Sequence, residues 1–343
     1  MRRHTRRFFV GAVASAMLLL GSCSNADDDG GNASGNEPLD EVTYLTGFGA
    51  FGRESYAWVA LEKGYFEEEG IAATIQTGTG AGDNVALVSS GQAQFAQVDL
   101  TGAMLLWGQE ASQEFTVVAA IHQRTLTGIM TLEGNDIDSP TDLEGKTIGD
   151  IVPGSVNYTL FPTYAQLAGI DPDKVTWENA PPQELAGLLG SGRVDAIGQF
   201  MVGVPLVAAA AGGREVISLP YSDYRTDLYG GVIITSKQLA QDDPDLVQRF
   251  TRALLRGLEY TIENPQEAAE ILVKYQPEQN PEVAAAEVEL MANYVRPLSP
   301  GEPFGLITEE RVAQSIAVLE AAGAIPAGIT PQDLVQFDLV PSS

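Results

Sequence analysis

The sequence has a single cysteine, Cys23, and only two histidines, His4 and His122, in 343 residues. This scarcity excludes a disulfide framework and removes the usual ligands of zinc sites. Basic residues are also few, because 19 Lys+Arg stand against 46 Asp+Glu and leave a formal net charge of −27. A surface this acidic repels phosphate backbones, so nucleic acid is excluded as a partner. We expect neither a metal nor a cofactor.

The chain is nevertheless rich enough in apolar residues, at 44%, to bury a sizeable core. Its length predicts about two domains, or one chain folded as two lobes.

The N-terminus carries a targeting signal. Four arginines within the first seven residues precede the apolar run Phe8–Leu20, which is too short for a comfortable membrane span. The sequence LGSC at residues 20–23 resembles a bacterial lipobox, in which the cysteine thiol receives diacylglycerol and becomes the mature N-terminus. We therefore predict a lipoprotein signal peptide over residues 1–22 and lipidation of Cys23. An ordinary secretory signal with an incidental cysteine and an uncleaved anchor are the alternatives.

Residues 23–40 continue as a tether. Their sequence after the cysteine, SNADDDGGNASGNEPLD, has almost nothing to bury and is typical of a flexible linker. We predict a lipid-anchored, extracytoplasmic protein held at the outer face of a bacterial cell membrane.

From Glu41 onward, strand and helix patterns alternate, which favours an α/β fold. The same five-element order, strand–helix–strand–helix–strand, occurs twice. Its members are VTYLTG, SYAWVALEKGYF, IAATIQTG, 84–89 and QFAQVD in the first half, and KTIGD, SVNYTLFPTYAQLAG, VTWEN, PPQELAGLLGSG and VDAIGQF in the second. In the second half Pro162 either bends its helix or marks the start of it. The junctions Ser90–Phe95 and Ser191–Ala196 match, because in each a helix is expected to end on glycine and a strand to begin after one intervening residue.

The apolar strand TVVAAI, with His122 beyond it, and the strand GGVIITS are predicted to connect the two halves. The first lobe is then discontinuous, made of residues 41–123 and 230–343, and residues 124–229 form the second lobe. The C-terminal third is predicted to be helical and to serve packing, with helices at Asp245–Glu263, Gln266–Tyr275, Val283–Met291 and Glu309–Ala321.

A ligand is expected beyond the carboxyl ends of the strands, where two such sheet edges face each other. Backbone N–H groups at Gly82–Asn84 and Gly154–Asn157 are expected to bind polar groups of the ligand. We expect Phe48, Phe200 and Tyr221 to form the apolar walls of the site. Asp99 and Asp223 are expected to accept hydrogen bonds from donor groups of the ligand. The mixed charges in these loops tilt the expectation towards a neutral or cationic heteroaromatic ligand. The full set of candidate ligand-binding residues is Phe48, Arg53, Gly82, Asp83, Asn84, Asp99, Thr101, His122, Ser155, Asn157, Gln199, Phe200, Tyr221 and Asp223.

Motifs for other chemistries are missing. The loops GFGAFG and GTGAG match neither a dinucleotide-binding GxGxxG nor a P-loop, and either could be a tight turn. The sequence has no GxSxG elbow, so a Ser-His-Asp hydrolase has no specific support. An adhesion or structural protein would not explain two matching halves with glycine-rich strand ends.

Five segments carry a family resemblance: GYFEEEGI, SGQAQFAQVD, DLEGKTIG, SGRVDAI and GGVIITS. In this order behind a lipobox, they resemble substrate-binding proteins of ABC importers, in the nitrate/sulfonate/thiamine-pyrimidine-precursor group. The resemblance implies a two-lobed, type II periplasmic-binding fold with two crossover strands and a helical C-terminal third.

The resemblance also implies the function of a monomeric receptor that closes by a hinge around one solute, such as a thiamine pyrimidine precursor or an alkanesulfonate. Its expected partners are a membrane permease and an ATPase. Thiamine pyrimidine synthases of the same fold provide the alternative, an enzyme that uses pyridoxal phosphate. Those enzymes have an iron-associated, cysteine-rich motif, which is absent here, so we expect no enzyme.

Overall fold

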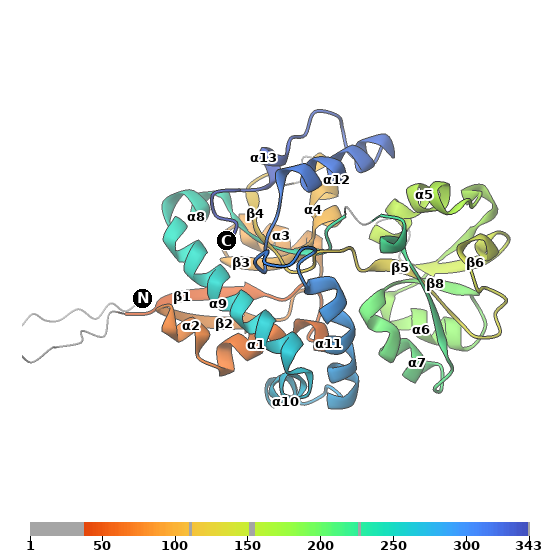
Figure 1. Ribbon diagram of the computed structural model, residues 1–343, viewed down its shortest axis with the longest axis horizontal. Coiled ribbons are helices and arrows are strands. Elements are labelled where there is room, and N and C mark those ends of the chain that lie inside the picture. Colours follow the sequence, from red (N-terminus) through yellow and green to blue (C-terminus); the bar gives the residue numbers. More distant parts are fainter. Residues whose placement is uncertain (1–37, 110–111, 151–154, 226–227, 342–343) are drawn as a thin grey trace, which may run out of the picture. The chain divides into compact units, whose positions relative to one another are not determined.

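The computed structural model describes residues 38–109, 112–150, 155–225 and 228–341. The predicted signal peptide, Cys23, nearly all of the tether, and Gly154 lie outside the described residues. The described chain contains two separate five-stranded sheets with helices between the strands (Figure 1). None of its helices is long and apolar enough to cross a membrane.

The first sheet has the strand order β2-β1-β3-β10-β4. Strands β1, β2 and β3 run parallel, and β10 is antiparallel to both of its neighbours. The bounds are β1 Asp40–Leu45, β2 Ile71–Gln76, β3 Phe95–Asp99, β4 Phe115–Ala120 and β10 Gly231–Ser236. Strand β10 thus joins the first sheet although it follows all five strands of the second sheet in the sequence.

The second sheet repeats this order as β7-β6-β8-β5-β9, again with three parallel strands and one strand, β5, antiparallel to its two neighbours. The bounds are β5 Thr127–Leu132, β6 Thr147–Asp150, β7 Thr176–Asn179, β8 Ala196–Phe200 and β9 Val216–Pro220. The predicted α/β repeat is confirmed.

The matching junctions fold alike. Gly91 and Gly192 follow helices α3 (Ala81–Ser89) and α6 (Pro182–Gly190) with φ of 74° and 72°, a conformation that favours glycine. Three residues after each glycine, a side-chain oxygen accepts the backbone N–H of a threonine in the first strand of that unit. The two pairs are Gln94 with Thr43 and Asp195 with Thr147, both at 2.8 Å.

Each sheet is covered by helices on both faces (Figure 1), and the alternation of side chains along the strands decides which core each residue joins. In β10, Val232 and Ile234 pack with helix α3 and helix α4, Leu100–Gly108. Ile233 points to the other face and packs with α1, Ser55–Glu62, and α9, Pro244–Glu263.

Three further α-helices precede the C-terminal third of the chain. They are α2 Tyr65–Glu68, α5 Val156–Ala168 and α7 Val204–Ala210, with short 3₁₀ turns that include η1 Gly52–Glu54 and η4 Met201–Gly203. Helix α5 begins before Pro162 and continues past it, so the prediction that this proline marks a helix start is wrong. The proline lies about one and a half turns into the helix. At the N-terminus of α5, Ser155 caps the helix, because its side chain accepts a hydrogen bond from the N–H of Tyr158.

The C-terminal third is helical, as predicted. Its further helices are α8 Lys237–Asp242, α10 Pro265–Tyr275, α11 Pro281–Val295, α12 Glu309–Ala321 and α13 Pro331–Leu334. Helices α9, α10, α11 and α13 each begin with proline, whose missing N–H is not needed in the first turn.

Helices α1 and α9 approach closely at Gly257. A Cβ at this position would lie 2.5 Å from the backbone oxygen of Tyr56 and 2.7 Å from the Cβ of Ala60. The contact involves backbone, so a methyl group can be accommodated only if the helices move apart.

We expect Gly257→Ala to lower the free energy of unfolding by roughly 1–3 kcal/mol, because overpacking separates the two helices. The matched control is Gly187→Ala in α6, where an added Cβ meets nothing within 4 Å. This control should gain up to about 1 kcal/mol from helix propensity. Urea unfolding of both variants measures the difference, and equal effects at the two positions would contradict the packing account.

Candidate functional site

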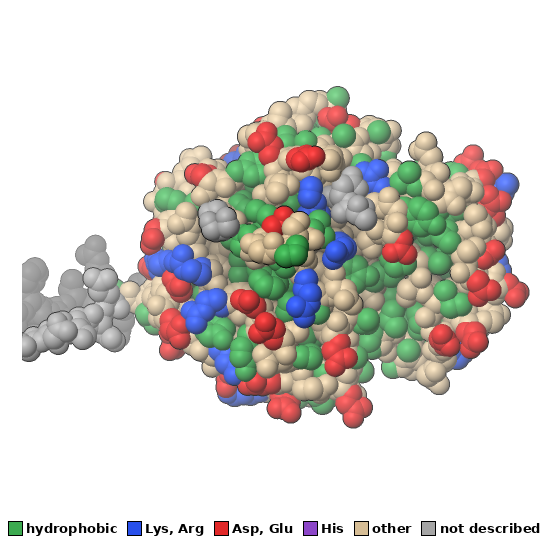
Figure 2. All heavy atoms as spheres, viewed as in Figure 1, with side chains coloured by type: hydrophobic (Ala, Val, Ile, Leu, Met, Phe, Trp, Pro, Cys, Tyr) green, Lys and Arg blue, Asp and Glu red, His purple; other side chains and the backbone are tan. Residues whose placement is uncertain are grey.

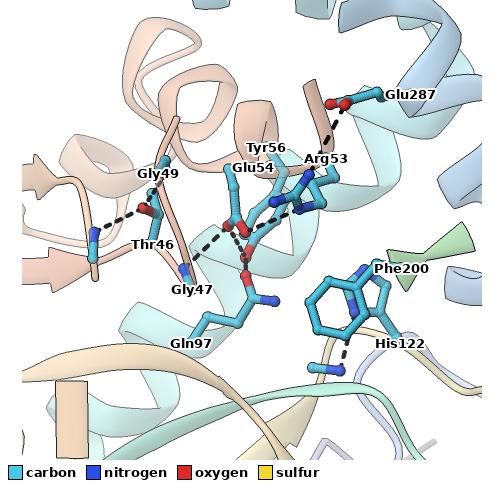
Figure 3. A network of polar contacts seen from close by, with 12 residues as sticks. Thr46, Gly47, Gly49, Arg53, Glu54, Tyr56, Gln97, His122, Phe200 and Glu287 are labelled. Atoms are coloured by element: carbon cyan, nitrogen blue, oxygen red, sulfur yellow. Dashed lines mark hydrogen bonds and ion pairs between the residues drawn. The ribbon is translucent and has the colours of Figure 1, made fainter. Parts of the chain in front are cut away.

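A buried group of polar side chains lies at the carboxyl ends of β1 and β3 (Figure 3). We call this group the Arg53 cluster and define it as Arg53, Glu54, Tyr56, Gln97, His122 and Glu287. Its members come from η1, α1, β3, the segment after β4, and α11. Residues far apart in the sequence therefore meet at one sheet edge.

The loop after β1 is held in place by hydrogen bonds with its neighbours. Thr46 accepts from the N–H of Gly78 at 3.0 Å, and the Asn84 amide donates to the backbone oxygens of Thr46 and Gln97 at 2.9 Å each. Gly78 must be glycine, because a Cβ there would lie 1.9 Å from the Thr46 backbone oxygen. This packing fixes the direction in which the chain enters η1.

Arg53 lies between two buried acids (Figure 3). Its guanidinium nitrogens are 3.9 Å from carboxylate oxygens of both Glu54 and Glu287, and it lies 4.4 Å from the centre of the Phe51 ring. The exposed fractions of the side chains are 11% for Arg53, 2% for Glu54 and 1% for Glu287. One cation thus faces two acids with little solvent to screen them.

Burial dominates the electrostatics of both acids. It raises the pKa of Glu54 to about 7, and the Arg53 charge and the N–H of Gly47 offset only part of the effect. Burial likewise raises the pKa of Glu287, again against Arg53. Neither carboxylate oxygen of Glu287 has a well-formed hydrogen bond among the described residues. Glu54 therefore accepts a proton readily near pH 7, and burial shifts Glu287 in the same direction, towards its protonated form.

Glu287 reaches the cluster because α11 packs directly on η1. A Cβ at Gly52 would lie 2.2 Å from the backbone oxygen of Ala284, one turn before Glu287. Ala284, Val288 and Met291 are buried on the same stretch of helix, so this acid sits within an apolar stripe.

A chain of hydroxyl and amide groups continues the cluster into the first sheet. The hydroxyls of Tyr44 and Tyr56 lie 2.8 Å apart, and the Tyr56 hydroxyl donates to the Gln97 side-chain oxygen at 2.6 Å. Burial raises the pKa of both tyrosines well above the ordinary value, so both remain neutral donors.

His122 closes the cluster on the side of the crossover. Its Nδ1 accepts from the backbone N–H of Gly231 at 3.1 Å, and its side chain is 1% exposed. Phe200, at the end of β8 in the second sheet, projects into the same region of Figure 3. The Phe200 ring is half-buried and packs against the core that contains Leu126 and Val202.

The fourteen predicted ligand-binding residues fall into four groups. Arg53 and His122 belong to the cluster, and Gln199 and Phe200 lie at the end of β8. Exposed positions are occupied by Phe48, Gly82, Asp83 and Asp223, with Phe48 42% exposed. Buried side chains or helix caps with backbone partners account for Asn84, Asp99, Thr101, Ser155, Asn157 and Tyr221.

The last group, of buried side chains and helix caps, serves the fold. Tyr221 stacks on Tyr164 with ring centroids 4.2 Å apart and donates to the backbone oxygen of Asn157. Asp99 caps α4 by accepting from the N–H groups of Thr101 and Gly102, and burial raises its pKa to about 7. For these residues, ligand contact stays a prediction.

Four cluster members were not in the predicted set: Glu54, Tyr56, Gln97 and Glu287. Gln97 could have been found as a polar residue inside an otherwise apolar strand, and Glu287 as an acid within an apolar helical stripe. No group of three or more His, Cys, Asp or Glu side chains within the described chain is placed to hold a metal ion.

A hollow in the surface lies at the crossover between the sheets. It has a volume of about 450 Å³ and is lined by Arg124, Ser222, Asn293, Tyr294, Arg296 and Pro297. Figure 2 shows acidic side chains scattered over this face of the molecule and Lys and Arg side chains gathered near the end of α11. Arg124 donates to the backbone oxygen of Asn293 at 2.6 Å and so binds the crossover to α11.

Comparison with known families decides the relationship. The family described as "NMT1/THI5 like" matches residues 55–268, more than half of the chain. The chain belongs to this family. Among curated members related to this NMT1/THI5-like chain is the formylaminopyrimidine-binding protein of Halalkalibacterium halodurans. The two are 27% identical over 332 residues, which cover 96% of this chain and 98% of that protein.

A second relative of the NMT1/THI5-like chain is named as an enzyme. The 4-amino-5-hydroxymethyl-2-methylpyrimidine phosphate synthase of Legionella pneumophila is 24% identical over 230 residues, covering 64% of this chain and 69% of that protein. Among solved structures, the periplasmic aliphatic sulphonate binding protein of Escherichia coli aligns with a TM-score of 0.69 and 14% identity. That alignment covers 86% of this chain and 92% of the other. The predicted family and the type II periplasmic-binding fold are confirmed.

The buried acids predict how stability depends on pH. Because the folded state raises the pKa of Glu54 from 4.5 to about 7, the folded protein binds more protons than the unfolded chain in this interval. Unfolding free energy should therefore fall as pH rises from about 4.5 to about 7. We expect Glu54→Gln to remove much of this loss. The unfolding free energy of the variant, relative to that of the wild type, should therefore rise by up to about 3 kcal/mol from pH 5 to pH 8.

Urea unfolding at the two pH values measures this effect. The exposed acid Glu41 provides the control, since Glu41→Gln should leave the pH dependence of the wild type unchanged. If Glu54→Gln also behaves as the wild type, Glu54 does not titrate in the folded state as described.

Proposed function

We propose that this protein is an extracytoplasmic receptor that binds a small heteroaromatic solute and delivers it to an ABC importer. The observation that carries the proposal is the Arg53 cluster, a buried polar site at the strand ends of a type II periplasmic-binding fold. Formylaminopyrimidine is the first candidate solute, because a full-length relative is named for binding it.

The electrostatics of the cluster favour such a solute. Arg53 supplies one positive charge, while Glu54 and Glu287 supply up to two negative charges. With one or both acids ionised the cluster is neutral or negative, which disfavours oxyanions such as nitrate or a sulfonate. An aminopyrimidine presents both ring-nitrogen acceptors and an amine donor, and a carboxyl group with a pKa near 7 can pair with either.

Aromatic contact is the second requirement for a flat ligand. Phe200 comes from the second sheet, while Arg53, Glu54 and Gln97 come from the first. We propose that residues 41–123 with 230–343, and residues 124–229, are two lobes that close by a hinge and bring Phe200 over the solute. Phe48, exposed at the end of β1, is a further candidate for stacking.

We propose binding without turnover, although the Legionella pneumophila relative is named a synthase. Cys23 is the only cysteine, so the cysteine-rich motif associated with the enzymes is missing. Burial and the nearby Arg53 lower the pKa of His122 to about 3, which makes this imidazole a poor general base. A synthase of the same fold remains the second candidate.

The remaining features concern location and partners. We propose that residues 1–22 are a signal peptide, that Cys23 carries a lipid, and that residues 24–40 tether a monomeric receptor to the outer face of the cell membrane. Its partners are then the permease and the ATPase of an importer.

Calorimetric titration and thermal unfolding test the receptor. Formylaminopyrimidine should bind and, at a hundredfold excess over Kd, stabilise the protein by about 2.7 kcal/mol. Nitrate and an alkanesulfonate should give weaker binding or none. We expect Phe200→Ala to weaken binding of formylaminopyrimidine by roughly tenfold, since it removes one aromatic contact.

The solute recovered after incubation should be chemically unchanged by mass spectrometry. Stabilisation by pyridoxal phosphate with iron alone, or conversion to a new pyrimidine, would favour the synthase. Leu206→Ala, an exposed apolar substitution in α7, is the control and should bind like the wild type.

Cys23→Ala should abolish membrane association, because the thiol that accepts diacylglycerol is lost. Metabolic labelling with a radioactive fatty acid and fractionation of cells measure the two consequences together. Ser24→Ala is the matched control and should stay labelled and membrane-bound. A Cys23→Ala protein that remains in the membrane fraction would show that another segment anchors the chain.

A further inference from the structure

His122 has one ring nitrogen engaged and one without a partner. Its Nδ1 accepts from the backbone N–H of Gly231 at 3.1 Å. Its Nε2 is buried and has no hydrogen-bond partner within the described residues. Among the buried polar atoms of the Arg53 cluster, this nitrogen is therefore left to find a partner outside the described chain.

The contact with Gly231 fixes the tautomer. A nitrogen that accepts a hydrogen bond carries no proton, so the single proton of a neutral imidazole must be on Nε2. Burial and the charge of Arg53 lower the pKa of His122 to about 3, which keeps the ring neutral at ordinary pH. His122 thus presents one N–H donor and no charge.

The packing of the crossover strands holds the ring in this orientation. A Cβ at Gly230 would lie 2.9 Å from the Cβ of His122, and a Cβ at Gly231 would lie 2.7 Å from its Nδ1. The same Cβ at Gly231 would lie 2.4 Å from the side-chain nitrogen of Gln97. Two successive glycines therefore let the backbone approach the imidazole, and the neighbours leave it little freedom to rotate.

A buried donor without an acceptor is rare in folded proteins and indicates a ligand or a functional role. The other polar groups of the cluster complement this donor. Glu54 and Glu287 can accept from an amine, while Tyr56 and Gln97 are already engaged with each other. Among the fully buried donor atoms of the cluster, the Nε2–H of His122 is thus the one without an acceptor in the described chain.

We infer that His122 is a specificity-determining residue whose Nε2–H donates to an acceptor atom of the solute, a carbonyl oxygen or an unprotonated ring nitrogen. The inference rests on the proposed function, since it names the hydrogen bond by which that site selects its solute. It makes an acceptor at this position a requirement for tight binding. Solutes that present only N–H groups or apolar atoms there are rejected.

Two substitutions of His122 separate its role in solute recognition from its structural contact with Gly231. In His122→Asn the amide oxygen replaces Nδ1 as the acceptor for Gly231, but no donor remains at the position of Nε2. In His122→Gln the amide nitrogen can reach the position of Nε2, but the acceptor for Gly231 is lost. We expect His122→Asn to weaken formylaminopyrimidine binding by about 10- to 100-fold and His122→Gln by less than about fivefold.

Stability of the unliganded protein should follow the opposite order. His122→Asn should unfold near the temperature of the wild type, while His122→Gln should unfold at a lower temperature, because the Gly231 N–H loses its partner. If His122 were merely structural, affinity and stability would fall together, with Gln the worse variant in both. That result would overturn the inference.

Nitrogen-15 NMR of histidine-labelled protein gives a readout that does not depend on a variant's affinity. The chain has only His4 and His122, and His4 lies within the proposed signal peptide, so the spectrum of His122→Asn identifies the signals of His122. We expect the proton of His122 on Nε2, no titration between about pH 5 and pH 8, and a shift of the Nε2 signal on addition of formylaminopyrimidine. A proton on Nδ1, or a titration in this range, would overturn the inference.

Failure of the inference and of the proposed function are distinguishable. If the wild type binds formylaminopyrimidine and His122→Asn binds it equally well, the inference is wrong and the receptor stands. If the wild type binds neither this solute nor the other members of the panel, the proposed function is wrong and the inference falls with it.

Discussion

Strand β10 lies between β3 and β4, and the rest of the arrangement depends on this placement. Along the chain, β4 is followed by the five strands of the second sheet, and β10 then returns to the first sheet between β3 and β4. Both crossover segments are therefore brought to the same sheet edge, where Gly230 donates to the backbone oxygen of His122 and Thr125 to that of Leu228. The polar site forms around this edge, with Gly231 against His122 and Gln97.

The Arg53 cluster buries one cation and two acids in an arrangement that is electrostatically unfavourable. Burying Arg53, Glu54 and Glu287 together removes water from three charged groups, and the distances of 3.9 Å show that no tight ion pair compensates for it. The raised pKa values of the two acids are the result. A solute that offers both donors and acceptors can satisfy these groups, which turns an unfavourable cluster into a source of binding energy and specificity.

Sequence patterns predicted the architecture because local signals determine it. The SG turns after α3 and α6 require a glycine with positive φ, prolines mark the first turn of four C-terminal helices, and the order of strands repeats. The site was predicted less completely. The strand-end rule selects the segments that carry Arg53, His122 and Phe200, but it does not say where side chains point. Asn84 and Asn157 turn inward to satisfy backbone groups, and Tyr221 stacks on Tyr164.

Contacts over long sequence distances account for the cluster members that were not predicted. Glu287 meets Arg53 only because α11 packs on η1, a contact between segments more than two hundred residues apart, which no local pattern encodes. Gln97 is recognisable in the sequence as a polar residue within an apolar strand, but its place beside Tyr56 and His122 follows from the central position of β3 in the sheet. His122 was singled out as the histidine of the crossover, but its tautomer and its free donor required the Gly231 contact.

The central claim is that the solute binds at the Arg53 cluster and that the second lobe supplies Phe200 to cover it. A crystal structure of the protein with formylaminopyrimidine tests this claim most directly. The account predicts the pyrimidine ring against Phe200, with an acceptor atom within hydrogen-bond distance of His122 Nε2 and its amine facing a carboxyl group of the cluster. A solute found instead in the hollow lined by Arg124 and Arg296, with the Arg53 cluster closed to it, would contradict the account.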